Sequence, residues 1–209
     1  MITEKINSIF DINECLFFKE RGMAGHEYIT SNNYYEWYYS LTKEIKPESI
    51  LEIGVRYGYS LCCMALACDK NVYLEGWDSV DTLPLSERDI LDVAKENLKN
   101  LGYNNFNIIT QDSHSIQKMP RKFDLVHIDG DHSYQGKIMD LDLVKNSCKY
   151  LIIDDYHHLP QVRMAVDFFM GQNQSIIKTA YVINSFRGTM FVEFLTDELP
   201  DLQLVESVQ

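Results

Sequence analysis

The chain has 209 residues, with 19 Lys and Arg against 31 Asp and Glu, which gives a formal net charge of -12. This surplus of negative charge disfavours nucleic acids and anionic membranes as partners, because both carry negative charge themselves. The longest uninterrupted apolar run, Leu61 to Cys68, is much shorter than the roughly 20 residues that a membrane-spanning helix needs. We therefore expect a soluble protein of one domain, residues 1–209.

The five cysteines are an odd set without a C-x-x-C motif, and Cys62, Cys63 and Cys68 share one apolar stretch. This pattern is typical of reduced thiols packed in a core. The first ten residues, MITEKINSIF, lack the continuous apolar segment of a signal peptide. Both observations favour a cytoplasmic protein.

The N-terminal part is mixed in composition, with a loop expected at residues 21–25 (RGMAG) and a helix at residues 34–45 (YYEWYYSLTKEI). We interpret residues 1–45 as a helical cap or lid over a core of residues 46–209. The aromatic side chains of that helix favour a core or a homodimer interface, and a substrate platform is the alternative. They are Tyr34, Tyr35, Trp37, Tyr38 and Tyr39.

Strands and helices alternate from residue 49 onward. The pattern predicts strands at residues 49–53, 71–77, 106–110, 123–128 and 149–153, and helices at 59–68, 86–102, 133–146 and 162–170. Two further strands, 175–183 and 188–195, are separated only by NSFR and are expected to form an antiparallel hairpin. The fold class that follows is a doubly wound, Rossmann-like α/β fold with a mostly parallel sheet.

Two of these helices have particular sequence features. The helix at 86–102 carries Ser86 and Asp89 as a capping box and Gly102 as its end. The helix at 133–146 is expected to bury one apolar face, formed by Tyr134, Ile138, Leu141 and Val144.

Acidic residues follow every strand of the parallel part of the predicted sheet. They are Glu52 at the end of the first strand, Asp78 after the second, Asp112 after the third, Asp129 and Asp131 after the fourth, and Asp154 and Asp155 after the fifth. Because the carboxyl ends of parallel strands lie at the same edge, these acids should gather where such sheets bind ligands.

The loop after the first strand, LEIGVRYGYS, contains Gly54 and Gly58, which let the backbone turn tightly and approach a ligand. Arg56 stands where a dinucleotide-binding loop would have its second glycine, which disfavours a diphosphate cofactor. Asp78 suits the two hydroxyls of a ribose, because one carboxylate can accept both hydrogen bonds. Together these features predict a nucleoside ligand without phosphates.

These motifs resemble those of class I S-adenosylmethionine-dependent methyltransferases, over roughly residues 36–194. LEIGVRYGYS resembles their first motif, GWD their ribose acid, and QDS the segment that borders adenine. The pair DLVHIDGDHSYQG and LIIDDYHH is similar to the group that contains macrocin-type, antibiotic sugar O-methyltransferases. The resemblance implies a cofactor site formed by Glu52, Gly54, Gly58, Ser60, Asp78, Asp112, Ser113 and Asp129.

In magnesium-dependent members of that group, three carboxylates hold the cation. The resemblance places this role on Asp129, Asp154 and Asp155, and the role of general base on Asp131, with His132 as the alternative base. Carboxylate oxygens suit a hard cation, and the cation can lower the pKa of the hydroxyl that is methylated.

Each of these residues also has a structural interpretation. Acids at strand ends are often solvated loop residues or helix caps, and Asp131 could cap the helix that follows it. For His127, inside the fourth strand, a buried core histidine is the favoured interpretation, and it is left out of the site.

The leading hypothesis is therefore a magnesium-assisted O-methyltransferase that acts on a small hydroxylated acceptor, such as a sugar. Two alternatives remain: a catalytically silent nucleoside-binding or accessory protein on the same fold, and a nicotinamide oxidoreductase, which Arg56 disfavours.

Overall fold

The computed structural model describes residues 34–79, 90–183 and 188–195. The expected loop at 21–25, the capping box of Ser86 and Asp89, and the hairpin connection at 184–187 lie outside these ranges. None of the helices within them is long and apolar enough to cross a membrane. In the described ranges, Cys62, Cys63 and Cys148 are buried, as predicted for thiols packed in a core.

The elements alternate as the sequence predicts, with boundaries shifted by one to a few residues. In chain order they are α4 (Tyr34–Ile45), β1 (Ser49–Ile53), α5 (Tyr59–Leu66), β2 (Tyr73–Asp78), α6 (Ile90–Asn100), β3 (Phe106–Thr110), the short 3-10 helix η4 (Ser113–Ser115), β4 (Phe123–Ile128), α7 (Tyr134–Val144), β5 (Cys148–Ile153), α8 (Pro160–Gln172), η5 (Gln174–Ile176), β6 (Ile177–Ile183) and β7 (Thr189–Phe194).

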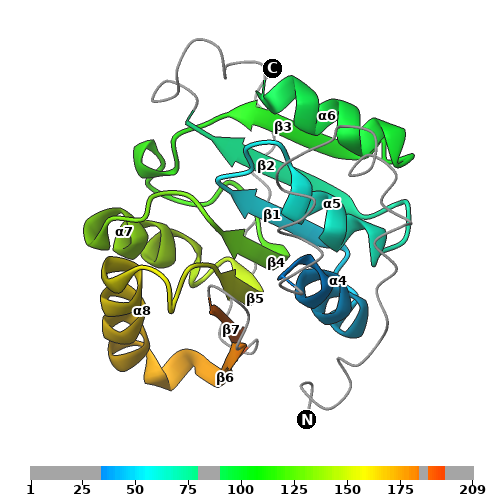
Figure 1. Ribbon diagram of the computed structural model, residues 1–209. Coiled ribbons are helices and arrows are strands. Elements are labelled where there is room, and N and C mark those ends of the chain that lie inside the picture. The colour runs from blue at the N-terminus through cyan, green and yellow to red at the C-terminus, as the bar shows by residue number, and fades with distance from the viewer. Residues whose placement is uncertain (1–33, 80–89, 184–187, 196–209) are drawn as a thin grey trace, which may run out of the picture.

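The seven strands form one sheet in the order β3-β2-β1-β4-β5-β7-β6 (Figure 1). The first five strands are parallel, and β7 pairs antiparallel with both β5 and β6. This confirms the doubly wound fold and its C-terminal antiparallel hairpin. The chain leaves β1 toward β2 on one side and returns on the other side at β4, so the switch point of the sheet lies between β1 and β4.

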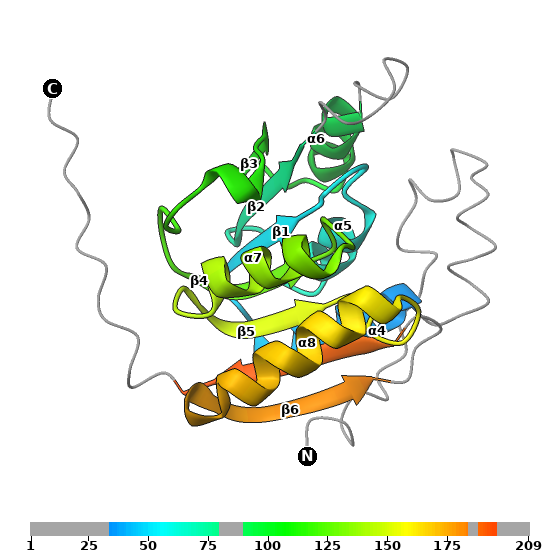
Figure 2. The ribbon, with the colours of Figure 1, turned by 90° about the vertical axis from the view of Figure 1, so that its left-hand side faces the viewer.

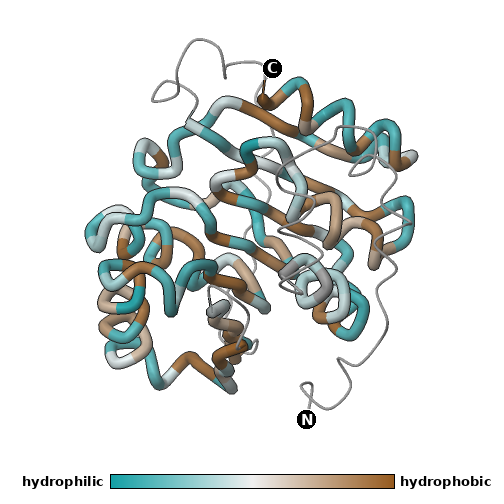
Figure 3. Tube along the Cα trace, viewed as in Figure 1, coloured by the Kyte–Doolittle hydropathy of each residue, from teal (hydrophilic) through white to brown (hydrophobic). Residues whose placement is uncertain are grey.

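Helices cover both faces of the sheet. Helices α4, α5 and α6 lie on one face, and α7 and α8 lie on the other (Figures 1 and 2). Alternate residues along each strand enter two separate cores, so that Ile50 packs with the first group of helices and Leu51 with the second. The apolar residues are concentrated in the central strands, whereas the loops at the strand ends are largely hydrophilic (Figure 3). This distribution leaves polar side chains at the edge where the parallel strands end.

The predicted cap or lid of residues 1–45 lies mostly outside the described ranges and remains a prediction. Within it, helix α4 packs on the first face of the sheet, where Tyr38 and Leu41 are buried against that core. The core interpretation is therefore confirmed for Tyr38. Helix α6 also ends as predicted: Gly102 has a φ of 82° and donates its backbone N–H to the carbonyl of Lys99 at 2.8 Å.

Helix α7 departs from the predicted pattern. Leu141 and Val144 are buried as predicted, but Tyr134 is exposed, and the charged side chains of Lys137 and Asp140 are both fully buried. The face of α7 that meets the protein interior is therefore partly polar.

Candidate functional site

The ends of β1 and β4 meet closely at the switch point of the sheet. The backbone N–H of Asp129 donates to the carbonyl of Ile53 at 2.8 Å, and Gly54 follows with a φ of 88°. A Cβ atom on Gly54 would lie 2.3 Å from the carbonyl oxygen of Asp129. Only glycine fits this position, because both the backbone angle and the space exclude a side chain.

The glycine loop is tied to the acid that follows β2. The backbone N–H of Arg56, which has a φ of 44°, donates to Asp78 Oδ2 at 2.8 Å. Burial raises the pKa of Asp78 and the charge of Asp129 acts in the same direction, although the hydrogen bond from Arg56 opposes both. The structure therefore brings Asp78, at the end of β2, into contact with the loop after β1 that contains Gly54. Both are predicted cofactor residues.

A fully buried histidine–carboxylate pair joins β1 to β4. His127 Nδ1 lies 2.8 Å from Glu52 Oε1, and the Ser60 hydroxyl donates to the same oxygen. The ring of Tyr38 packs on His127, with 4.8 Å between the ring centroids. Burial raises the pKa of Glu52, against the hydrogen bonds from His127 and Ser60.

The burial of His127 was predicted, but its contact with a predicted cofactor residue was not. Glu52 and His127 occupy paired positions of β1 and β4, which a single sequence cannot reveal. Within the described part of the chain, Glu52 Oε2 and His127 Nε2 have no hydrogen-bond partner.

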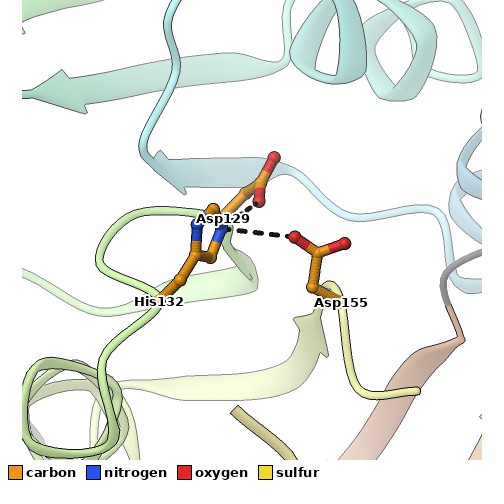
Figure 4. A group of neighbouring side chains, drawn as sticks. All are labelled: Asp129, His132 and Asp155. Carbon is orange, nitrogen blue, oxygen red and sulfur yellow. Dashed lines mark hydrogen bonds and ion pairs between the residues drawn. The ribbon is translucent and has the colours of Figure 1, made fainter. Parts of the chain in front are cut away.

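Asp129, His132 and Asp155 converge beyond the ends of β4 and β5 (Figure 4). His132 Nε2 lies 3.3 Å from Asp129 Oδ1 and 3.3 Å from Asp155 Oδ2. One atom from each residue lies within 4.8 Å of the other two. The other ring nitrogen of His132 points away from both carboxylates (Figure 4). We call these three residues the carboxylate–histidine group.

The two carboxylates of the group differ in backbone conformation and in electrostatic environment from ordinary aspartates. Asp155 has a φ of 60°, a backbone conformation that is uncommon for residues other than glycine. Burial acts to raise the pKa of Asp129, but the hydrogen bond from His132 and the electrostatic interactions with His127, Lys137 and His132 outweigh it and lower that pKa below its usual value.

The chemistry of this donor set fits a divalent cation. Two carboxylate oxygens face one point, and carboxylate oxygens are the ligands that Mg²⁺ prefers. The predicted third carboxylate, Asp154, is fully buried, and the Thr189 hydroxyl donates to its Oδ1 at 3.5 Å. The structure thus brings together Asp129 and Asp155 with His132, and the assignment of Asp154 as a ligand remains a prediction.

Asp131 lies at the start of α7. Its Oδ1 accepts a hydrogen bond from the backbone N–H of Ser133 at 2.7 Å, and Ser133 Oγ in turn accepts one from the N–H of Gly136 at 3.1 Å. Burial acts to raise the pKa of Asp131, but the hydrogen bonds from Ser133 and the charges of His114 and Lys137 lower it overall. Ser133 is therefore the helix cap, and the role of Asp131 as a base remains a prediction.

The segment expected to border adenine is bound to the inner face of α7. Asp112 Oδ1 accepts from the backbone N–H of His114 at 2.9 Å, and Ser113 Oγ donates to Asp140 Oδ1 at 2.6 Å. His114 Nε2 lies 3.4 Å from the same oxygen of Asp140. Asp140 was not singled out from the sequence. The available signal was its spacing of three residues from Lys137, which places the two charged residues on one face of the helix.

Two hollows lie away from these acids. One of about 450 Å³ is lined by residues of α8 and the hairpin, including Asp167 and Met190. The other, of about 670 Å³, includes Lys43 and Asp69 and lies beside the start of β1 and the end of α5. Neither contains a residue of the carboxylate–histidine group, so the strand-end acids remain the candidate site.

A family model described as a methyltransferase domain matches residues 51–156, from β1 to the loop after β5. No curated protein sequence gives a significant match. Among solved structures, the chain is similar to the SAH-bound methyltransferase PaMTH1 of Podospora anserina, with 15% identity, 93% of this chain and 92% of that chain covered, and a TM-score of 0.61.

Two further structures show the same likeness. The O-methyltransferase TomG of Streptomyces achromogenes, in complex with SAM, has 15% identity, covers 92% of this chain and 94% of its own, and gives a TM-score of 0.61. An O-methyltransferase of Bacillus cereus, in complex with SAH, has 15% identity, covers 92% of this chain and 100% of its own, and gives a TM-score of 0.60. At these identities the likeness shows a shared fold.

Proposed function

The chain belongs to the methyltransferase domain family, and on that premise we propose that it transfers the methyl group of S-adenosylmethionine to a hydroxyl oxygen of a small acceptor. The observation that carries the proposal is the meeting of the glycine loop and Asp129 at the switch point between β1 and β4. A nucleoside bound over that loop would have the carboxylate–histidine group beside it.

Each part of the proposed cofactor site can be assigned to residues that the structure describes. Asp78 would accept hydrogen bonds from the ribose hydroxyls, and the loop with Gly54 lets the backbone approach the ligand. The segment that contains Asp112 and Ser113 would border the adenine, held in place by α7. Glu52 and Asp129 would give the methionine end a negatively charged environment, which suits the positive charges of its ammonium and sulfonium groups.

The reaction is an in-line displacement. The acceptor oxygen forms a bond to the methyl carbon, the bond from that carbon to sulfur breaks, and the electron pair returns to sulfur, which leaves as the neutral thioether of S-adenosylhomocysteine. The hydroxyl proton passes to a base of the protein. The protein therefore mainly has to align the oxygen with the methyl group and exclude water.

Asp131 and His132 are the two candidates for that base. Asp131 is hydrogen-bonded to Ser133, which stabilises its charged form and weakens it as a proton acceptor. His132 is oriented by two carboxylates through Nε2, and its other nitrogen is turned away from them and can accept a proton (Figure 4). These contacts favour His132.

Magnesium assistance belongs to the same proposal. Asp129 and Asp155, with Asp154 as the further predicted ligand, would hold Mg²⁺, and the bound ion would lower the pKa of the acceptor hydroxyl. The acceptor that we propose is a sugar or a sugar-containing metabolite, from the resemblance of IDGDHSY and DDYHH to macrocin-type enzymes.

The test is methyl transfer itself. Purified protein would be incubated with S-adenosylmethionine and a panel of sugars with vicinal hydroxyls, with Mg²⁺ or with EDTA, and methylated products would be detected by mass spectrometry. A methyl ether formed only with active protein supports the proposal, and its loss in EDTA supports the metal part. Binding of NADH in place of S-adenosylhomocysteine would contradict the proposal in favour of an oxidoreductase.

A further inference from the structure

Lys137 is a charged residue in an unusual position. It is the fourth residue of α7, its side chain is fully buried, and within the described residues its Nζ atom has no hydrogen-bond partner. A buried ammonium without hydrogen bonds is costly. An apolar residue of similar length would pack there at lower cost, so a purely structural role does not explain the charge.

The face of α7 that carries Lys137 lies against the loop that follows β4. Asp140, three residues later on the same face, places its Oδ2 3.5 Å from the position that a Cβ atom of Gly130 would occupy. Gly130 separates Asp129 from Asp131. The inner face of the helix therefore reaches the loop that holds the first carboxylate of the carboxylate–histidine group.

Four carboxylates interact electrostatically with the Lys137 ammonium. The charge of Asp129 acts on it most strongly, followed by Asp140, Asp155 and Asp131. Burial lowers the pKa of Lys137, whereas all four carboxylates oppose that shift and favour the charged ammonium. Two of the four, Asp129 and Asp155, are the carboxylates that face each other in the carboxylate–histidine group.

We propose that Lys137 is an internal counter-cation of the carboxylate–histidine group and that it lowers the affinity of Asp129 and Asp155 for a divalent cation. The inference rests on the metal part of the proposed function. The ammonium attracts both carboxylates and repels a divalent ion placed between them. Because Lys137 lies behind the site, on the inner face of α7, it acts as a positioning residue and does not touch the acceptor.

The consequence is a site that releases its cation readily. With a positive charge built into the protein wall, the repulsion between Asp129 and Asp155 is partly offset without a bound metal. We therefore expect weak and reversible binding of Mg²⁺ by the natural sequence, and tighter binding once the ammonium is removed.

The test is calorimetric titration of the full chain with MgCl₂, for the natural sequence and for Lys137→Met, which keeps the length and removes the charge. Lys145→Met is the matched control, because Lys145 pairs with Asp142 at 2.8 Å at the far end of the same helix. We expect Lys137→Met to bind Mg²⁺ about tenfold more tightly than the natural sequence, and Lys145→Met to leave the affinity unchanged.

A second variant and a second readout guard against a folding defect. Lys137→Gln should show the same gain in Mg²⁺ affinity, and Mg²⁺ should raise the thermal midpoint of both Lys137 variants more than that of the natural sequence. Equal Mg²⁺ affinities for all proteins would overturn the inference while leaving the metal site in place. An absence of Mg²⁺ binding in every variant would overturn both this inference and the metal part of the proposed function. Methyl transfer that continues in EDTA would separately contradict the metal part.

Discussion

Two of the histidines in the described part of the protein, His127 and His132, contact carboxylates in different surroundings. His127 and Glu52 are 2.8 Å apart and fully buried, whereas His132 lies 3.3 Å from both Asp129 and Asp155 with 45% of its side chain exposed. The first contact joins two strands, and the second lies between the segments that follow β4 and β5. The same pair of chemical groups is thus fully buried in one contact and partly exposed to solvent in the other.

The largest expected effect is on stability at the buried contact. His127→Leu leaves the buried carboxylate of Glu52 without its main partner, and removing one member of a buried pair typically costs about 3–5 kcal/mol. His132→Leu, at the exposed contact, should change the free energy of unfolding by less than about 1 kcal/mol. Urea denaturation of both variants measures the difference, and similar losses for both would remove the distinction between the two contacts.

The second prediction concerns turnover at the exposed contact. If His132 takes the acceptor proton, His132→Ala should lower kcat by about 10²- to 10⁴-fold. The affinity for S-adenosylhomocysteine should stay nearly the same, because the exposed contact is not part of the proposed ribose or adenine site. Steady-state kinetics and a binding titration measure the two quantities. Asp131→Ala is the companion variant, and a larger loss of kcat in that variant would make Asp131 the base.

The third prediction concerns Asp78, which belongs to neither histidine–carboxylate contact and tests cofactor binding alone. Asp78→Ala removes the carboxylate that the Arg56 amide holds at the end of β2, and the loss of hydrogen bonds to a charged group should weaken binding of S-adenosylhomocysteine by about 10- to 100-fold. Calorimetry measures the affinity, and circular dichroism checks that the fold is retained. An unchanged affinity would show that Asp78 does not contact the ribose.

The smallest expected effects are opposite dependences of stability on pH. The pKa of Glu52 is raised in the folded protein, so its contribution to the unfolding free energy becomes less favourable as pH rises from about 4.3 through that folded-state pKa. The pKa of Asp129 is lowered, so its contribution is present above about pH 3.9 and is lost as pH falls through its folded-state value.

Urea denaturation across the acidic range, with Glu52→Gln and Asp129→Asn beside the natural sequence, measures these two contributions. In Glu52→Gln, the unfolding free energy should no longer contain the part that declines as pH rises. In Asp129→Asn, it should no longer contain the part that increases as pH rises. The same change of slope in both variants would contradict the assigned directions.

The order of the elements was predictable because their signals are local. Apolar runs that end in acids mark β1, β4 and β5, and Gly102 marks the end of α6 through its left-handed backbone. The gathering of Asp78 and Asp129 at one edge was also predictable, because parallel strands end on the same side.

The contacts across the sheet were not predictable from one sequence. The pairing of His127 with Glu52 depends on the register of β4 against β1, which no local pattern encodes. The burial of Lys137 and Asp140 depends on how α7 is rotated over the sheet. These two charged residues share the buried face with Leu141 and Val144, whereas Tyr134, which was expected on that face, is exposed. The participation of His132 with two carboxylates depends on loop geometry around Asp129 and Asp155.

The most direct measurement of the central claim is a calorimetric titration of the purified protein with S-adenosylhomocysteine, carried out with Mg²⁺ and again with EDTA. We expect binding with a dissociation constant in the micromolar range, retained in EDTA, because Gly54 and Asp78, which are proposed to hold the nucleoside, are not among the proposed metal ligands. A folded sample that does not bind S-adenosylhomocysteine under either condition would contradict the assignment of this edge of the sheet as a cofactor site.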